Sequence, residues 1–333
     1  MPESKQTIVF QLLEQHSTKD AVSAFLKAKG LKFSAQNWEK MFSDRLIPGL
    51  ESGAITFDEL HHLISEGEEY GKQHIFLYQL DESSVVEILS QHHVTDVLAK
   101  LALTNLPKMV VTPDQTEIVD VRLIPGNSLT IKSLSPRISR HMLSDDTVGT
   151  RQTMVWDLRT ERAVNIVNLD ITGMVQVRLQ SISGASKHYA NELDEFWDLV
   201  DPFIPVAKVT KTPIQSAKGY LWENRLRLTG QVRYTDSTLR NDKGFKVYAT
   251  GDNKADINSD AGISQGLDVF YRMKGYCDAA NIWLIKGTEA DPEFIHVILS
   301  GDVNEYHLPQ KCSRLDHEYC LNKLREFNQE APV

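Results

Sequence analysis

The sequence has few cysteines and no long apolar run, and each shortage excludes a class of protein. Three cysteines occur in 333 residues, and all follow residue 276, so the disulfide scaffold of a secreted protein is not expected. No window of about 18 apolar residues exists, and the N-terminal segment carries charges where a secretory signal needs an apolar stretch. We therefore expect a soluble intracellular protein, located in the cytoplasm, with reduced thiols.

The motifs of several enzyme classes are also missing. The phosphate-binding patterns GxxxxGK[ST] and GxGxxG, the nucleophile pattern GxSxG and the zinc-protease pattern HExxH do not occur. Cys312, His317 and Cys320 lie close together in sequence but lack the paired spacing of a structural zinc site, and Cys320 falls on the apolar side of a predicted helix. We assign no catalytic residue and expect neither a cofactor nor a metal site.

The residue patterns divide the chain into three parts. Residues 1–72 show helical spacing only. Residues 73–206 begin with an apolar run at 74–80, typical of a strand buried on both sides, and continue as alternating segments that predict an antiparallel sheet. Residues 207–333 contain strands and helices again. The predicted fold is α+β: a small N-terminal helical bundle followed by two mixed α/β modules with largely antiparallel sheets.

Basic charge is concentrated in two segments, residues 131–190 and, more strongly, residues 207–250, although the net charge of the chain is -9. Residues 207–250 hold nine Lys and Arg against three Asp and Glu, with Phe245 and Tyr248 among them. Within this segment RLRLTGQVRY, residues 225–234, alternates as a half-buried strand does, with arginines on one face and Tyr234 on the core side. Basic strand faces suit a phosphate backbone. The expected nucleic-acid ligands are Arg225, Arg227, Arg233, Arg240, Lys243 and Lys246.

Two other accounts of these cations stay open. The arginines of residues 225–233 can form ion pairs with the acidic segments on either side, residues 191–200 and 251–260, or they can bind an acidic protein partner. The ion-pair account assigns them a structural role only.

The N-terminal bundle is expected to bind a protein partner or a second copy of the chain. Its AQNWEKMFSDRL helix is neutral, whereas a helix that reads DNA usually has a basic surplus. Trp38, Phe42 and Leu46 are therefore candidate partner contacts. Thr56 with Glu59 three residues later predicts a capping box at the start of the following helix.

These observations favour a non-catalytic binding or assembly subunit of an intracellular multiprotein complex that contacts nucleic acid through basic sheet faces. DNA maintenance, transcription and anti-phage defence are settings in which such a subunit would act. The alternative is a metal-dependent nuclease or other phosphodiester hydrolase, because Asp252 and Lys254 have the spacing of such sites and further carboxylates follow in the loop. No membrane contact is expected.

Overall fold

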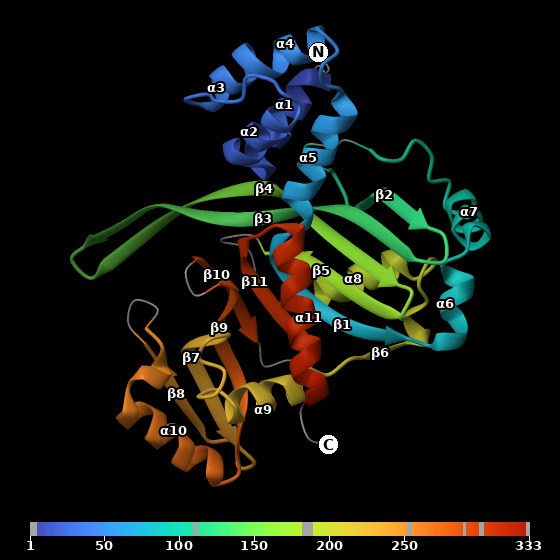
Figure 1. The fold of residues 1–333 in the computed structure, drawn as a ribbon. Helices are drawn as coiled ribbons and strands as arrows, with labels where there is room; N and C mark the ends of the chain where they lie inside the picture. The colour runs from blue at the N-terminus through green and yellow to red at the C-terminus, as the bar shows by residue number, and fades with distance from the viewer. Residues whose placement is uncertain are drawn as a thin grey trace.

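The computed structural model describes residues 5–108, 111, 113–181, 189–251, 255–288, 291–299 and 303–330. Figure 1 shows a group of N-terminal helices at one end, a long twisted sheet through the middle and a two-stranded arm that projects from the sheet. The α+β class is confirmed, with helices preceding a large antiparallel sheet.

The N-terminal helices form a small bundle around an apolar core of their own. The hydroxyl of Thr56 accepts a hydrogen bond from the Glu59 amide, and the Glu59 carboxylate accepts one from the Thr56 amide, which confirms the predicted capping box. The elements are α1 Lys5–His16, α2 Lys19–Ala28, α3 Trp38–Met41, the π-helical turn Phe42–Leu46, α4 Ile47–Glu51 and α5 Phe57–Glu69.

One sheet joins the rest of the described chain, in the order β2-β3-β4-β5-β1-β11-β10-β9-β7-β8, and β6 adds to β1. Neighbouring strands are antiparallel throughout these pairings. The strands are β1 Gly71–Leu80, β2 Glu117–Ile124, β3 Ser128–Val148, β4 Arg151–Asp170, β5 Met174–Gln180, β6 Val209–Lys211, β7 Val232–Asn241, β8 Lys246–Thr250, β9 Gly275–Thr288, β10 Asp291–Leu299 and β11 Glu305–Lys311.

Strand β1 lies in the middle of the sheet and is buried on both faces, as its apolar run predicted. Ile75 and Leu77 contribute to the core on one face, whereas Phe76 and Tyr78 contribute to the core on the other. The single sheet therefore contains strands of both predicted α/β modules. The division into separate domains, with boundaries near residues 72 and 206, stays a prediction.

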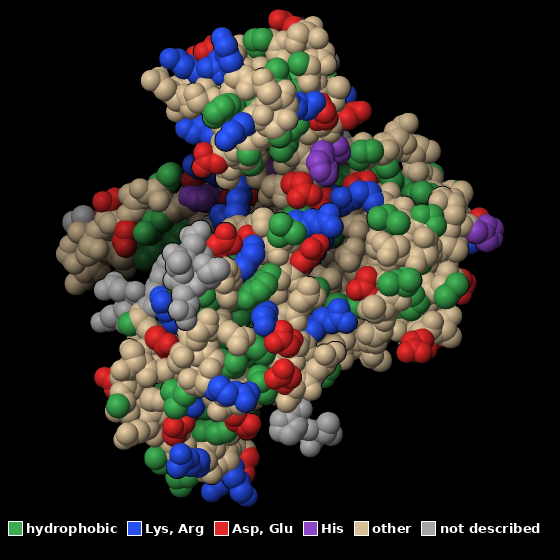
Figure 2. All heavy atoms as spheres, viewed as in Figure 1, with side chains coloured by type: hydrophobic (Ala, Val, Ile, Leu, Met, Phe, Trp, Pro, Cys, Tyr) green, Lys and Arg blue, Asp and Glu red, His purple; other side chains and the backbone are tan. Residues whose placement is uncertain are grey.

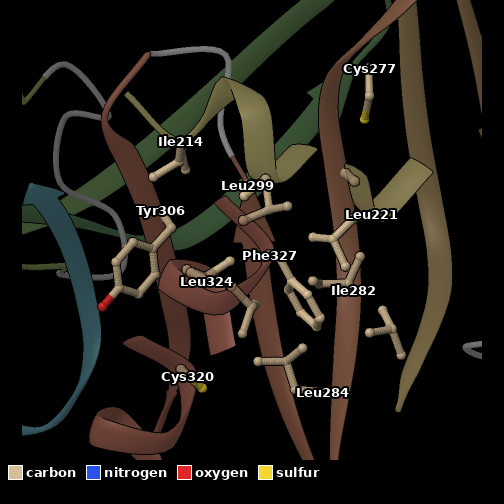
Figure 3. Packing of buried hydrophobic residues seen from close by; sticks show 14 of the residues in the cluster. Ile214, Leu221, Cys277, Ile282, Leu284, Leu299, Tyr306, Cys320, Leu324 and Phe327 are labelled. Atoms are coloured by element: carbon tan, nitrogen blue, oxygen red, sulfur yellow. The ribbon is translucent and has the colours of Figure 1, made fainter. Parts of the chain in front are cut away.

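The helices cover different faces in the two halves of the sheet. Helices α6 Glu82–Ile88, α7 Gln91–Lys100 and α8 Ala190–Val200 cover one face in the β2 to β1 half. Helices α9 Gln215–Glu223, α10 Ala261–Arg272 and α11 Arg314–Glu330 cover the opposite face in the β11 to β8 half. Figure 3 shows this second core, where Leu324 and Phe327 of α11 pack on Ile282 and Leu284 of β9.

The arm is the outer part of the β3–β4 hairpin, residues 138–160 (Figure 1). The two strands pair from Ser128 opposite Asp170 to Val148 opposite Arg151, so the hairpin extends far beyond its neighbours β2 and β5. Sequence periodicity predicted only parts of these strands, because the outer segment is not buried against a core and its alternation is broken by a register shift between Met142 and Ser144.

The predicted strand at residues 225–234 is wrong for most of its length. Residues 224–231 form turns after α9, and β7 begins at Val232. Leu228 is buried but Leu226 is largely exposed, so the alternation in this segment does not correspond to one face of a sheet. Tyr234 lies in β7 and is buried in the core, as expected.

Candidate functional site

The uncovered face of β8, β7 and β9 brings together basic and aromatic side chains. On β8, Val247 and Ala249 pack against the core, so Lys246 and Tyr248 point to the opposite side. Arg240 of β7 is the direct cross-strand partner of Lys246 on β8 and of Tyr276 on β9. These side chains share one face, because residues directly opposite each other in antiparallel strands point the same way. We call this surface, together with the β7–β8 turn, the basic sheet face.

The aromatic rings of the basic sheet face are accessible. Tyr248 is 64% exposed, Phe245 in the β7–β8 turn is 66% exposed, and Tyr276 is 39% exposed. Rings exposed to this extent leave apolar surface in contact with water. A ligand with flat apolar surfaces could bury that surface by stacking on them. Sequence reasoning singled out Phe245 and Tyr248 but missed Tyr276, because β9 begins before the apolar stretch that marked it.

The cations of this face differ in how they are paired. Lys246 Nζ lies 3.2 Å from a carboxylate oxygen of Asp278. The Arg240 guanidinium and the Lys243 ammonium have neither a hydrogen bond nor an ion pair within the part of the chain that the structure describes. Asp236 on β7 accepts a 2.5 Å hydrogen bond from the Asn281 amide, and Asp242 is exposed in the β7–β8 turn beside Lys243. Two cations therefore remain available to an anion.

Arg233 lies farther along β7, away from this group. Its guanidinium carbon is 4.8 Å from the centre of the Phe294 ring on β10, a cation–π arrangement, and the side chain is half-buried. Arg233 and Arg240 therefore lie on β7 and Lys246 lies on β8, with Lys243 in the turn between these two strands.

Arg225 and Arg227 do not lie on the basic sheet face. Arg225 is 4% exposed, donates a 2.5 Å hydrogen bond to Asp268 of α10, and lies 4.4 Å from the centre of the Trp222 ring. Arg227 is exposed and donates to the hydroxyl of Tyr220 at 2.8 Å. The expected arginine row at 225–233 is therefore split, because the first two arginines belong to the turn that joins α9 to β7.

The three candidate contacts in the bundle belong largely to its interior. Leu46 is fully buried in the bundle core. Phe42 stacks on Phe10 at 4.5 Å between ring centres and on Trp38 at 5.4 Å, and both rings are half-buried. Packing within the bundle accounts for these residues, so only the outer edges of Trp38 and Phe42 can contact a partner without opening the bundle.

A buried charge network between α5 and the sheet was not predicted. Glu68 lies 2.6 Å from Lys132 Nζ on β3 and also accepts a hydrogen bond from Arg162 on β4. Burial alone would raise the pKa of Glu68, but Lys132 and Arg162 lower it to about 2. The network attaches the bundle to the sheet. Periodicity could not find it, because Lys132 and Arg162 occupy polar positions that are normally assigned to solvent.

A stack of rings crosses the middle of the same face as the basic sheet face. His74 of β1 lies 4.1 Å from His307 of β11 and 4.0 Å from Tyr189, centre to centre, and His74 Nδ1 is 2.6 Å from a Glu305 oxygen. Burial, followed by the nearby His74, lowers the pKa of His307 to about 3. Despite this grouping, no set of three or more His, Cys, Asp or Glu among the described residues is arranged to hold a metal ion.

The hydrolase candidates and the cysteines are the remaining residues that the sequence singled out. Asp252 and Lys254, the candidates of the hydrolase alternative, lie outside the described residues. Cys277 and Cys320 are buried free thiols and Cys312 is a half-buried one, as expected for Cys320. Burial raises the pKa of Cys277 to about 12, which makes this thiol a poor nucleophile.

Comparison of the chain with known protein families, with curated proteins and with solved structures gives no significant match. No helix in the described ranges is long and apolar enough to cross a membrane.

Proposed function

We propose that this protein is a non-catalytic binding subunit that contacts single-stranded nucleic acid through its basic sheet face. The observation that carries the proposal is the placement of Arg240 and Lys243, two cations with no ion pair among the described residues, beside three accessible rings on one face of the sheet. Such a subunit would act in the cytoplasm within a complex, in DNA maintenance, transcription or anti-phage defence.

Single strands are favoured over duplexes by the geometry of the rings. Tyr248, Tyr276 and Phe245 offer faces or edges on which unpaired bases can stack, whereas the bases of a duplex are already stacked on each other. Arg240, Lys243 and Lys246 are placed around these rings and supply the charges that a phosphate backbone requires. Lys274, exposed at the end of α10 next to Tyr276, adds a further cation at this edge.

Two of the original candidates are left out of the proposal for physical reasons. Arg225 cannot reach a phosphate without losing its buried pairing with Asp268. Arg227 is accessible but lies in the α9–β7 turn rather than beside the rings. Arg233 is retained as an outer contact because it continues the β7 row.

The proposal is tested by fluorescence anisotropy with a labelled 20-nucleotide oligo(dT) at low salt. Wild type should bind, and the double variant Arg240→Gln, Lys246→Gln should bind at least about ten-fold more weakly, since each phosphate contact contributes a charged interaction. The matched control is Lys32→Gln, Lys100→Gln, which removes two exposed lysines elsewhere on the surface. Equal weakening in both double variants would show a general charge effect and contradict the proposed site.

The hydrolase alternative rests on Asp252 and stays a prediction. If it holds, labelled DNA or RNA should be cut in the presence of Mg²⁺ or Mn²⁺, and Asp252→Asn should abolish cutting while oligo(dT) binding persists. Intact substrate with wild-type protein, across both metals and both nucleic acids, would remove this alternative and leave the binding function.

A further inference from the structure

A cavity of about 320 Å³ opens between the end of α5, strands β2 to β5 and the start of α11. Its lining is mostly polar. Figure 2 shows Lys, Arg, Asp and Glu side chains gathered in this region, below the N-terminal helices where α5 meets the sheet. The lining includes Tyr70, Asn168, Gln176, Arg178 and His317.

Arg178 is the unusual member of this lining. It is 4% exposed, its Nη1 donates a 2.8 Å hydrogen bond to the Glu69 carbonyl, and its guanidinium lies 5.2 Å from the centre of the Tyr70 ring. Its buried Nε has no hydrogen-bond partner in the described part of the chain. Within the described ranges, no carboxylate forms an ion pair with it.

Other buried cations on this sheet have carboxylate partners. Lys132 is paired with Glu68 at 2.6 Å, and Arg137 with Glu192 at 3.0 Å. A buried charge without a counter-charge is costly, so native proteins normally pair such groups. Arg178 lies in the wall of a cavity and has no carboxylate partner among the described residues. This is the arrangement expected of a group that binds an anion.

His317 supplies a second incompletely bonded group in the same wall. It is 3% exposed, its Nε2 lies 3.1 Å from the Gln176 side-chain oxygen, and its buried Nδ1 has no hydrogen-bond partner among the residues that the structure describes. Asn168 on β4 is the direct cross-strand partner of Gln176 on β5, so its position is diagonal to Arg178 on the same face, and its amide nitrogen donates a 2.8 Å hydrogen bond to Thr130 on β3. Amide, imidazole and guanidinium groups therefore converge on one cavity.

We propose that this cavity binds a small molecule bearing an oxyanion, either a phosphate or a carboxylate, that accepts hydrogen bonds from Arg178. The planar guanidinium matches both anions with two parallel hydrogen bonds. The volume is at the lower end of the range of small-molecule sites, roughly 300 to 1,000 Å³, which excludes a polymer from the cavity itself. The site is independent of the basic sheet face, which lies in the other half of the sheet.

The test measures thermal unfolding and calorimetric binding of the full chain with inorganic phosphate and, separately, with succinate. At least one should bind saturably to wild type. Arg178→Met should be as stable as wild type or more so, since it removes an unpaired buried charge, and should lose at least about ten-fold in affinity. Arg159→Met on the arm, a surface change of the same chemistry, should bind as wild type does.

A second variant tests the same cavity independently, in case Arg178→Met does not fold. Asn168→Asp is nearly isosteric and places a carboxylate diagonally beside Arg178, so it should raise the melting temperature and weaken anion binding. The preference between phosphate and succinate identifies the class of oxyanion. Binding of neither anion to wild type, or an unchanged affinity in both variants, would overturn the proposal.

A different observation, the exposed apolar face of the arm, carries a second inference. Met142 and Trp156 are directly opposite on one face, and Leu158 and Met154 flank Trp156 on β4. Trp156 is 47% exposed and Leu158 62%. The other face of the arm is largely polar, for example at the His141 and Asp157 pair. A two-stranded hairpin with a bare apolar face is marginally stable in water, so a cover is expected.

The charges on this apolar face match a second copy of the same arm. Arg140, opposite Leu158, lies two residue pairs toward the base from the Met142–Trp156 pair. Asp145, opposite Met154, lies two residue pairs toward the tip. A two-fold axis through the Met142–Trp156 pair therefore places Arg140 of each copy near Asp145 of the other. The arm as a whole has three Arg and three Asp, so it offers no net charge to a polyanion.

We infer that the arms of two copies pack face to face and antiparallel, which makes the protein a homodimer. Sedimentation velocity at micromolar concentration should show a dimer for wild type and a monomer for Met142→Thr, Trp156→Thr. The matched polar-face variant His141→Thr, Asp157→Thr should stay dimeric.

Charge exchange distinguishes this packing from other dimers. Arg140→Asp should weaken the dimer, because it places two carboxylates together, and adding Asp145→Arg should restore it. A monomeric wild type, or a double exchange that fails to rescue Arg140→Asp, would overturn the inference.

Discussion

Arg240 of β7 and Lys246 of β8 are direct cross-strand partners on an uncovered sheet face. Like charges in directly opposite positions destabilise an antiparallel pair. Asp278 lies 3.2 Å from Lys246 and offsets part of this repulsion, but no carboxylate in the described structure pairs with Arg240. The Arg240–Lys246 pair thus lowers the stability of the fold and leaves Arg240 available. Such a pair is expected at a site whose positive charge binds a ligand.

Replacing Arg240 with threonine should therefore separate binding from stability. Arg240→Thr removes the repulsion with Lys246 and places a good strand former on β7, so the free energy of unfolding should rise by about 0.2 to 1 kcal/mol. Oligo(dT) affinity should fall in the same variant. Urea unfolding and anisotropy measured on one preparation check both changes, and a variant that is less stable than wild type would show that Arg240 has an undetected structural partner.

Truncation of Arg225 and of Arg227, two residues apart, should lower the stability by very different amounts. Arg225→Ala removes a buried guanidinium that pairs with Asp268 and packs on Trp222, so it should lower the free energy of unfolding by about 3 kcal/mol. Arg227→Ala changes an exposed side chain and should cost less than about 0.5 kcal/mol. Urea unfolding of the pair provides the comparison. Equal effects would contradict the turn structure at residues 224–231.

Glu66 and Glu68 of α5 provide a similar matched pair. Glu68→Gln leaves Lys132 and Arg162 buried beside a neutral amide and should cost about 3 to 5 kcal/mol. Glu66→Gln is the same chemical change on a half-buried side chain of the same helix and should cost less than about 0.5 kcal/mol. Thermal unfolding at pH 7 distinguishes them, and a small effect of Glu68→Gln would show that the bundle is not attached through this network.

His317 should make the protein less stable in mild acid. Burial, with Arg178 adding to it, lowers the pKa of His317 from its usual 6.5 to about 3. The pKa of His317 is lower in the folded state than in the unfolded state. The stability that depends on neutral His317 is therefore fully present above about pH 6.5 and is lost as the pH falls toward 3. Wild type should lose about 2 kcal/mol between pH 7 and pH 5 through this residue, and His317→Gln should lose that much less. Urea unfolding at both pH values measures the difference, which would vanish if His317 were protonated in the fold.

Sequence patterns succeeded where burial imposes a regular period. The apolar run of β1 and the capping box of α5 were identified because each is a local signal with one structural solution. The segment at residues 225–231 failed for the opposite reason. Its alternation of arginine and leucine satisfies the strand pattern, but Arg225 gains more from Asp268 and Trp222 than from a solvent face, and the chain turns instead.

The candidate site was only partly accessible to sequence reasoning. Arg240, Lys243, Lys246 and Tyr248 were chosen from composition, and strand pairing later placed them together, whereas Tyr276 is 28 residues beyond Tyr248 and becomes a neighbour only through the β7–β9 pairing. The Arg178 cavity gave no sequence signal, since it depends on contacts between α5, β5 and α11. Long-range placement of this kind is not encoded in any local period.

The salt dependence of oligo(dT) binding tests the central claim most directly. The logarithm of the association constant should fall linearly with the logarithm of the salt concentration, and each phosphate contact on a single strand contributes about 0.7 to the slope. The variant Arg240→Gln, Lys246→Gln should therefore have a slope smaller in magnitude by about 1.4, while Lys32→Gln, Lys100→Gln should keep the wild-type slope. A wild-type protein that does not bind at low salt, or a slope that is identical in all three proteins, would contradict nucleic-acid binding by the basic sheet face.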